Sequence, residues 1–132
     1  MGILTDFTAR GQLRQMCWVR IGFGLSVVAA PRLLARATLG SAATSGATGY
    51  AMRMWGVREA ALGAITLREL AGDGPSRELV GLNAAVDAVD ALATALAGRT
   101  VPWARKAPIL VGALVAVGAS ARLLRELEEG AA

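Results

Sequence analysis

Of the 132 residues in the chain, 55% are hydrophobic and only 18% are charged. Since soluble domains have about 25% charged residues, this balance indicates a membrane protein and excludes intrinsic disorder. The absence of histidine and the single cysteine exclude common zinc sites, His-dependent catalytic triads and an internal disulfide, while the dispersed cations behind the net charge of +4 fit lipid headgroups and buried ion pairs better than nucleic acid.

Four hydrophobic segments, each followed by a turn signal, make up most of the chain. Pro31 lies inside the last turns of the first segment, and a charge-free, glycine-rich linker at 40–49 precedes the second. The sequence Gly-Asp-Gly-Pro at 72–75 indicates a helix stop, a turn and a proline-led restart. Because the connections are short, we expect neighbouring segments to be antiparallel. The segments span residues 12–36, 50–71, 76–97 and 102–127.

The length of these segments favours a membrane bundle. Each has 20 or more residues, enough to cross the roughly 30 Å hydrocarbon core. None has an uninterrupted apolar run of about 18 residues, so a soluble four-helix bundle stays open as an alternative. The stretch 109–121 is apolar all round, however, which a surface helix does not tolerate. We therefore predict an all-α, four-helix transmembrane bundle that forms a single domain.

Polar side chains of the third segment form one seam, at the four-three-four spacing of Asn83, Asp87, Asp90 and Thr94. Beside the seam lies a stripe of small residues where another helix backbone can approach closely. The stripe consists of Ala84, Ala88, Ala91 and Ala95. The remaining face is bulky and apolar, which suits lipid or a packed core. The pattern predicts a helix that hides its seam inside a bundle.

The second segment has a complementary pattern. Gly56, Ala60 and Gly63 share a face that suits tight helix contact. Arg58 and Glu59 lie near the midpoint of the segment. Antiparallel pairing with the third segment places these two charges at about the depth of its two aspartates.

The four ionisable groups sum to a charge of minus two, and each ion near the bilayer centre costs on the order of 2.5–3.5 kcal/mol. Two explanations are open: Arg20 and Arg53 reach in from opposite ends of their helices, or one or more carboxyls stay protonated. We expect a structural ion-pair network that fixes helix register. A proton- or cation-linked site is the alternative.

Aromatic residues and charges near the segment ends give weaker indications. Trp18, Trp55, Trp103 and Tyr50 fit either an interfacial belt or ordinary core packing. Residues 122–129 continue the fourth segment as an amphipathic helix end. Cations divide equally between the two membrane faces, so the positive-inside rule does not orient the chain. We expect cytoplasmic termini and no cleaved signal peptide.

Two motifs, Gly-Val-Arg-Glu at 56–59 and Val-Asp-Ala-Val-Asp at 86–90, follow a helix that ends in Ala-Pro-Arg-Leu-Leu at 30–34. With this order over about residues 18–98, the sequence resembles the DUF4267-like family of small actinobacterial membrane proteins. The resemblance implies a four-helix protein of the bacterial inner membrane, with Arg58 paired to the aspartates. It implies no particular activity or cofactor.

We expect a multi-pass membrane protein that is not an enzyme and binds no cofactor, metal or nucleic acid. Small size and small-residue helix faces favour an accessory or assembly subunit that packs against a larger membrane complex. The alternative is a homo-oligomeric, proton- or ion-linked carrier or channel for a small solute, with Asp87, Asp90 and Arg58 as a switchable charge site. A soluble interaction module and an enzyme acting on lipid complete the alternatives.

Overall fold

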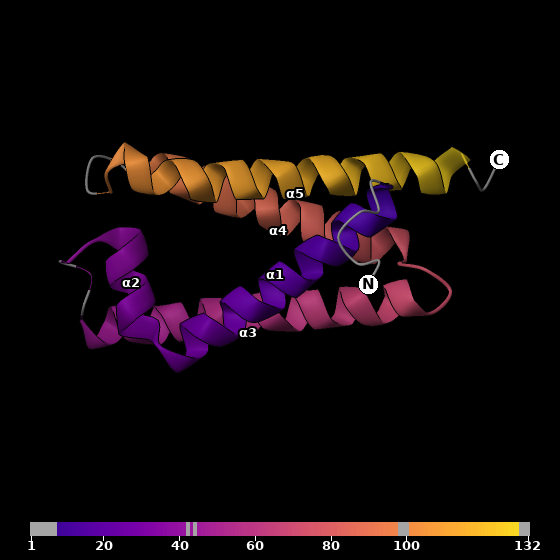
Figure 1. Cartoon of the computed structure of the whole chain (residues 1–132). Coiled ribbons are helices and arrows are strands. Elements are labelled where there is room, and N and C mark those ends of the chain that lie inside the picture. Colours follow the sequence, from indigo (N-terminus) through magenta and orange to yellow (C-terminus); the bar gives the residue numbers. More distant parts are fainter. Residues whose placement is uncertain (1–7, 42, 44, 98–100, 130–132) are drawn as a thin grey trace.

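The computed structural model describes residues 8–41, 43, 45–97 and 101–129, and all regular secondary structure in these ranges is helical (Figure 1). The all-α class is confirmed, but the described residues form five helices, and a four-helix bundle is not confirmed. Residues 1–7, on which the expectation of an uncleaved N-terminus partly rests, lie outside the described residues. The helices are α1 Ala9–Ala29, α2 Pro31–Leu39, α3 Gly46–Ala71, α4 Arg77–Leu96 and α5 Trp103–Glu129.

Pro31 divides the first predicted segment into two helices. A proline lacks the backbone N–H and collides with the preceding turn, so α1 ends at Ala29 and Pro31 becomes the first residue of α2. The two helices are bent by 111° relative to each other. The single helix predicted over 12–36 is therefore wrong, and α2 instead folds back toward the start of α5 (Figure 1).

Arg105 of α5 holds the C-terminal end of α2 in this position. Its Nη1 donates to the carbonyl oxygens of Arg36 and Ala37 at 2.7 and 2.8 Å. The carbonyl of Arg36 also accepts from the backbone N–H of Gly40, whereas that of Ala37 belongs to the last turn, whose carbonyls lack intrahelical donors. The guanidinium also lies at the negative end of the helix dipole. One side chain thus provides the C-terminal cap of α2 from another helix.

We expect Arg105→Met to increase the hydrogen-exchange rate of the α2 amides by roughly tenfold, because two charge-assisted hydrogen bonds are lost at an exposed site. Hydrogen exchange followed by mass spectrometry measures this change. The control is Arg32→Met, which removes an exposed cation from α2 itself. Unchanged exchange in the Arg105→Met protein would contradict the capping role.

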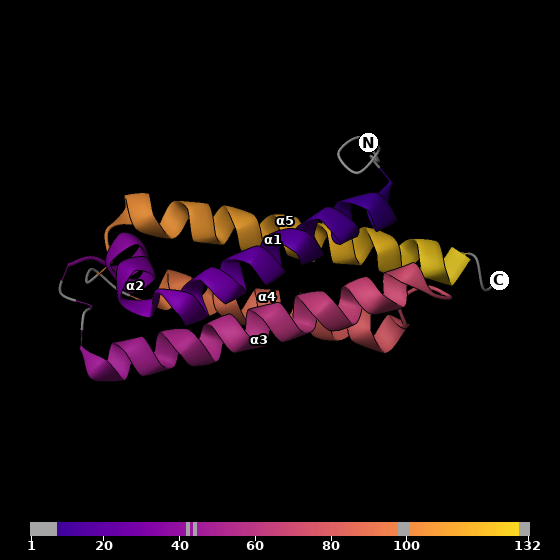
Figure 2. The same cartoon turned by 60° about the horizontal axis from the view of Figure 1, so that its bottom comes forward.

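Two close helix pairs build the fold, α1 with α3 and α4 with α5 (Figure 1). The helices α3, α4 and α5 run in alternating directions, as the short connections predict (Figure 1). However, α3 and α4 contact each other only slightly, whereas α1 lies against both α3 and α5 (Figure 2). The expected pairing of the second and third segments is therefore replaced by a pairing across α1.

Glycines allow α1 and α3 to pack backbone against backbone. A Cβ atom on Gly24 would lie 2.5 Å from the carbonyl oxygen of Gly56, and one on Gly63 would lie 2.8 Å from that of Cys17. The same Cβ atom on Gly24 would lie 2.7 Å from the backbone nitrogen of Ala60. The small residues predicted for helix contact on the second segment thus face α1.

The alanine stripe of α4 has a different environment. Ala88 is exposed, and Ala84 and Ala91 are half-buried. The stripe therefore does not form a continuous close contact within this chain.

Two small apolar clusters lie on either side of the polar residues. One contains Val27, Ala35 and Met52, and the other is built around Cys17 and Val80. Along α3, Glu59 lies between Met52 and the residues that pack on the second cluster. The fold therefore has a polar centre between two apolar ends.

Two helices, α4 and α5, are long and apolar enough to cross a membrane, and the bent pair α1 and α2 raises the number to three if it forms one broken span. The four predicted spans are not confirmed. Helix α3 differs because every stretch of 18 residues within it contains Arg58, Glu59 and at least one more charged residue. Large apolar side chains are exposed on all the long helices, as at Val19, Val57 and Leu114.

Candidate functional site

Arg20 of α1 is the centre of a polar network that joins three helices. Its Nε donates to Glu59 Oε2 of α3 at 2.9 Å, and its Nη2 donates to Glu59 Oε1 at 3.3 Å. Its Nη1 donates to Asn83 Oδ1 and Asp87 Oδ2 of α4 at 3.0 and 3.2 Å. The side chains of Arg20 and Glu59 are only 12% and 9% exposed. Paired, bidentate geometry of this kind is what stabilises charges away from water.

Arg58 binds the acidic residues from the outer side of the network. Its Nη2 donates to Glu59 Oε1 at 3.2 Å and to a carboxylate oxygen of Asp90. Its side chain is 39% exposed, so it is more accessible to solvent or lipid headgroups than Arg20. Glu59 is therefore shared between two guanidinium groups.

Asn83 fixes the position of α4 in the network. Its Nδ2 donates to Thr66 Oγ1 and to the carbonyl oxygen of Leu79, both at 2.9 Å, which leaves Oδ1 to accept from Arg20. Asn83 and Thr66 are both buried. This hydrogen bond joins α3 to α4 where their backbones barely touch.

The structure brings together six of the seven residues predicted for the charge network: Arg20, Arg58, Glu59, Asn83, Asp87 and Asp90. Arg53 is exposed and takes no part in the ion pairs among the described residues. Thr94, the last residue of the predicted seam, donates to the backbone carbonyl of Asp90 instead. The sequence analysis missed Thr66, because its link to Asn83 depends on how α3 and α4 are rotated.

The network has an excess of negative charge. Two guanidinium groups, Arg20 and Arg58, face three carboxyl groups, so two positive and three negative charges give a formal sum of minus one. The carboxyl groups belong to Glu59, Asp87 and Asp90. Because the side chains of Glu59 and Asp87 are largely buried, water screens this charge poorly, and a cation or a proton in the vicinity is favoured.

A cavity of about 650 Å³ lies beside the network. Drug-sized small molecules occupy pockets of roughly 300–1,000 Å³. Four residues of the network, Arg20, Glu59, Asp87 and Asp90, lie in its wall. Further polar lining residues are Gln15, Thr38, Asn83, Arg105 and Ser120. The remaining wall is mainly apolar and includes Met16, Phe23, Trp55, Ile109 and Ala113.

One face of α5 lines the cavity over four helical turns. The lining residues recur at intervals of four from position 104 to position 120, a length of about 24 Å at 1.5 Å per residue. They are Ala104, Pro108, Gly112, Ala116 and Ser120. Their small size keeps the space open, and a Cβ atom on Gly112 would have no neighbour within 4 Å.

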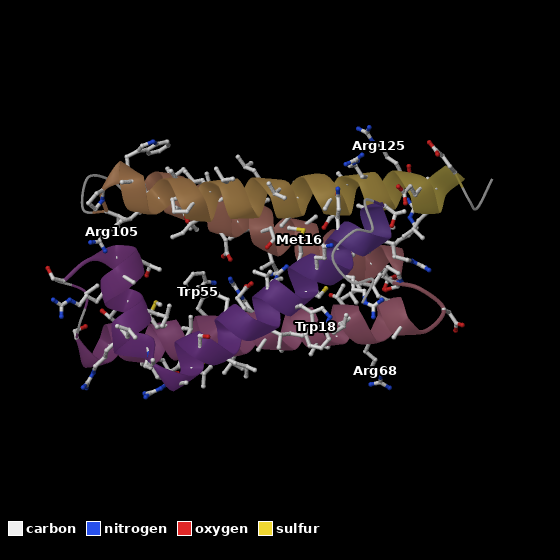
Figure 3. All side chains as sticks on the ribbon, in the orientation of Figure 1. Met16, Trp18, Trp55, Arg68, Arg105 and Arg125 are labelled. Carbon is white, nitrogen blue, oxygen red and sulfur yellow. The ribbon has the colours of Figure 1, made fainter. Side chains whose placement is uncertain are left out.

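Two aromatic rings form part of the cavity wall. Phe23 and Trp55 meet edge to face, with ring centroids 5.1 Å apart and an interplanar angle of 73°. Figure 3 shows Trp55 extending from α3 into the space between the helix pairs. By contrast, Trp18, Trp103 and Tyr50 are exposed on the surface.

Ser120 lies in the cavity wall and has no partner for its hydroxyl group. The residue is 1% exposed, and its Oγ forms no hydrogen bond within the described part of the chain. A buried hydroxyl without a partner costs about 1–3 kcal/mol. Because the Oγ atom has almost no accessible surface, it lies behind the cavity wall and not on it.

No protein-family model matches the sequence, and neither a curated protein nor a solved structure is detectably similar to the chain. The resemblance to the DUF4267-like family stays a prediction from its motifs. Among the described residues, no group of three or more cysteine or acidic side chains is arranged to hold a metal ion. The network and the cavity are therefore the features of the described chain that bear on its function.

Proposed function

We propose that the chain is a small multi-pass membrane protein that binds a small solute in its cavity and carries it across the bilayer as a self-associated assembly. The observation that supports this proposal most strongly is the cavity of about 650 Å³ with a buried charge network in its wall. Ionisable side chains inside a membrane are costly, and they typically mark solute or proton pathways.

Membrane insertion follows from the surface and from the network together. The apolar helices α4 and α5 cross the bilayer, and the bent pair α1 and α2 forms a broken span. Helix α3 crosses with them, because Glu59 is buried in the network and the half-buried Arg58 is neutralised by Glu59 and Asp90. The host membrane is the bacterial inner membrane, with cytoplasmic termini.

The broken span supports a carrier in particular. Ala37 and Thr38, in the last turn of the short helix α2 that follows the break, line one end of the cavity. Discontinuous helices beside a central binding site are typical of secondary transporters, in which they permit one part of the protein to move against another. One copy has few helices, so we propose that copies associate to enclose the pathway.

An accessory subunit of a larger membrane complex is the second candidate. It is supported by the large apolar side chains exposed on α4 and α5, which suit a partner as well as lipid. These include Val89, Leu92, Leu96, Val111 and Leu114. However, the small-residue face of α3, which motivated a partner on sequence grounds, is covered by α1.

Accessibility of the cavity to water tests the carrier. Because Cys17 is the single cysteine, Cys17→Ser gives a cysteine-free background in which Ala113→Cys places a thiol in the cavity wall. Leu114→Cys, at the next residue, places a thiol on the exposed outer surface as a matched control. We expect a membrane-impermeant thiol reagent to label position 113 in both right-side-out and inside-out vesicles, and position 114 in neither, because thiols in lipid do not ionise.

Labelling at position 113 from neither side, in protein that keeps its helical circular dichroism, would remove the carrier proposal. Gentle purification from native membranes, with identification of the proteins that co-purify, tests the accessory-subunit candidate. A larger membrane protein present at a fixed stoichiometry would favour the accessory subunit over the carrier.

A further inference from the structure

We propose that the solute is a hydrophobic organic cation, an amine or onium ion whose charged group lies against Asp87 and Asp90 and whose apolar body lies along α5. This inference rests on the proposed function and names the class of its solute. It follows from the charge and the wall chemistry of the same cavity.

The charge of the wall selects for cations. Glu59, Asp87 and Asp90 all line the cavity, whereas of the two network arginines only Arg20 does so. Arg58 binds from the outer side, and including it the network still carries a formal charge of minus one. A positive ligand restores neutrality, while an anion meets two or more carboxylates at short range.

The other arginine in the wall does not reverse this selection. Arg105 lies where α5 meets α2, and its Nη1 is bound to the carbonyl oxygens of Arg36 and Ala37. The partial negative charge at the end of α2 offsets about half of its positive charge. The cavity is thus negative at the network and weakly positive at the α2 end.

The apolar wall favours an organic cation over a metal ion. A small inorganic cation needs several oxygen ligands to replace its water, and the described residues form no metal-binding group of three or more. An onium ion is weakly hydrated and gains from contact with aromatic rings, which Phe23 and Trp55 provide. Its apolar substituents fit the small side chains along α5.

Two probe ions of matched size and opposite charge test the inference. In the Cys17→Ser, Ala113→Cys protein in detergent micelles, the rate of reaction with a neutral maleimide reports occupation of the cavity. We expect tetraphenylphosphonium to slow this reaction and tetraphenylborate to leave it unchanged at the same concentration. The concentrations needed for equal protection should differ by roughly tenfold or more, since only the cation balances the network.

Substitutions then locate the charge. We expect Asp87→Asn or Asp90→Asn to raise the tetraphenylphosphonium concentration for half protection by on the order of tenfold. Because these changes disturb the ion pairs, Trp55→Leu provides a second variant that leaves the network charge intact. It should weaken protection by roughly fivefold to thirtyfold through loss of the cation–aromatic contact. Val115→Ala, on the exposed face of α5, is the matched control.

The outcomes distinguish failure of the proposed cation from failure of the proposed carrier function. Equal protection by both ions, or protection by tetraphenylborate alone, overturns the cation. A position 113 thiol that reacts but is protected by neither ion overturns the cation and leaves the water-accessible cavity in place. A thiol that reacts under no condition removes the proposed function and this inference with it.

The source of the cation is decided by lipid competition. Phosphatidylethanolamine carries an ammonium group, and phosphatidylglycerol does not. If phosphatidylethanolamine competes with tetraphenylphosphonium and phosphatidylglycerol does not, the cation is a lipid headgroup. Competition by neither lipid assigns it to a free solute, and competition by phosphatidylglycerol only contradicts the inference.

Discussion

Substitution of Arg20 by methionine is expected to lower the free energy of unfolding by about 3–5 kcal/mol, the cost of leaving buried charges without a partner. Arg20 donates to Glu59 through two nitrogens and to Asn83 and Asp87 through a third. Methionine keeps much of the apolar stem but leaves Asp87 without its guanidinium partner and Glu59 with Arg58 alone. Unfolding by sodium dodecyl sulfate in mixed micelles, followed by circular dichroism, measures the change.

Two further variants separate the electrostatic effect from lost packing. Arg53→Met removes an exposed arginine and is expected to change stability by less than about 0.5 kcal/mol. Combining Arg20→Met with Glu59→Gln and Asp87→Asn removes the charges together and should recover part of the loss, because neutral side chains are cheaper to bury. A loss below about 1 kcal/mol for Arg20→Met alone would mean that the carboxyls are already neutral.

A second large effect is expected at Gly24, where alanine should destabilise the protein by about 2–3 kcal/mol. The new methyl group would lie 2.5 Å from the carbonyl oxygen of Gly56 and 2.7 Å from the backbone nitrogen of Ala60. Both are backbone atoms, so the clash is relieved only by moving α1 away from α3. That movement also pulls Arg20 away from Glu59.

Gly22 provides the matched control two residues earlier in the same helix. A Cβ atom there has no neighbour within 4 Å, so Gly22→Ala is expected to stabilise α1 by roughly 0.5–1 kcal/mol through its higher helix propensity. Thermal unfolding in detergent, compared for the two variants, measures the difference in sign. Similar effects of the two substitutions would show that α1 and α3 do not pack backbone to backbone.

Much of the secondary structure follows from local patterns in the sequence. The apolar periodicity and the turn at 72–75 predict the α3, α4 and α5 helices to within a few residues. The sequence pattern also places Pro31 inside the last turns of the first predicted segment, and so predicts one helix across it. The structure shows a new helix, because the folded-back α2 gains contacts with α3 and α5 that no local pattern reveals.

The candidate site was predictable only in part, for a related reason. The spacing of Asp87 and Asp90 and the midpoint position of Arg58 predict that these charges meet. The central role of Arg20 depends on α1 lying between the two predicted partners, which is set by the contact of Gly24 with Gly56. The cavity depends on the distance between α1 and α5, a quantity that no residue pattern within one helix records.

The position of Arg20 in the chain has a consequence for biogenesis of the proposed membrane protein. Arg20 is synthesised 39 residues before Glu59 and 67 residues before Asp87. Until α3 emerges from the ribosome, α1 holds an unneutralised guanidinium, whose burial at the bilayer centre costs on the order of 2.5–3.5 kcal/mol. Stable insertion of the first helix therefore waits for the third, so the nascent chain integrates as a cooperative unit rather than helix by helix.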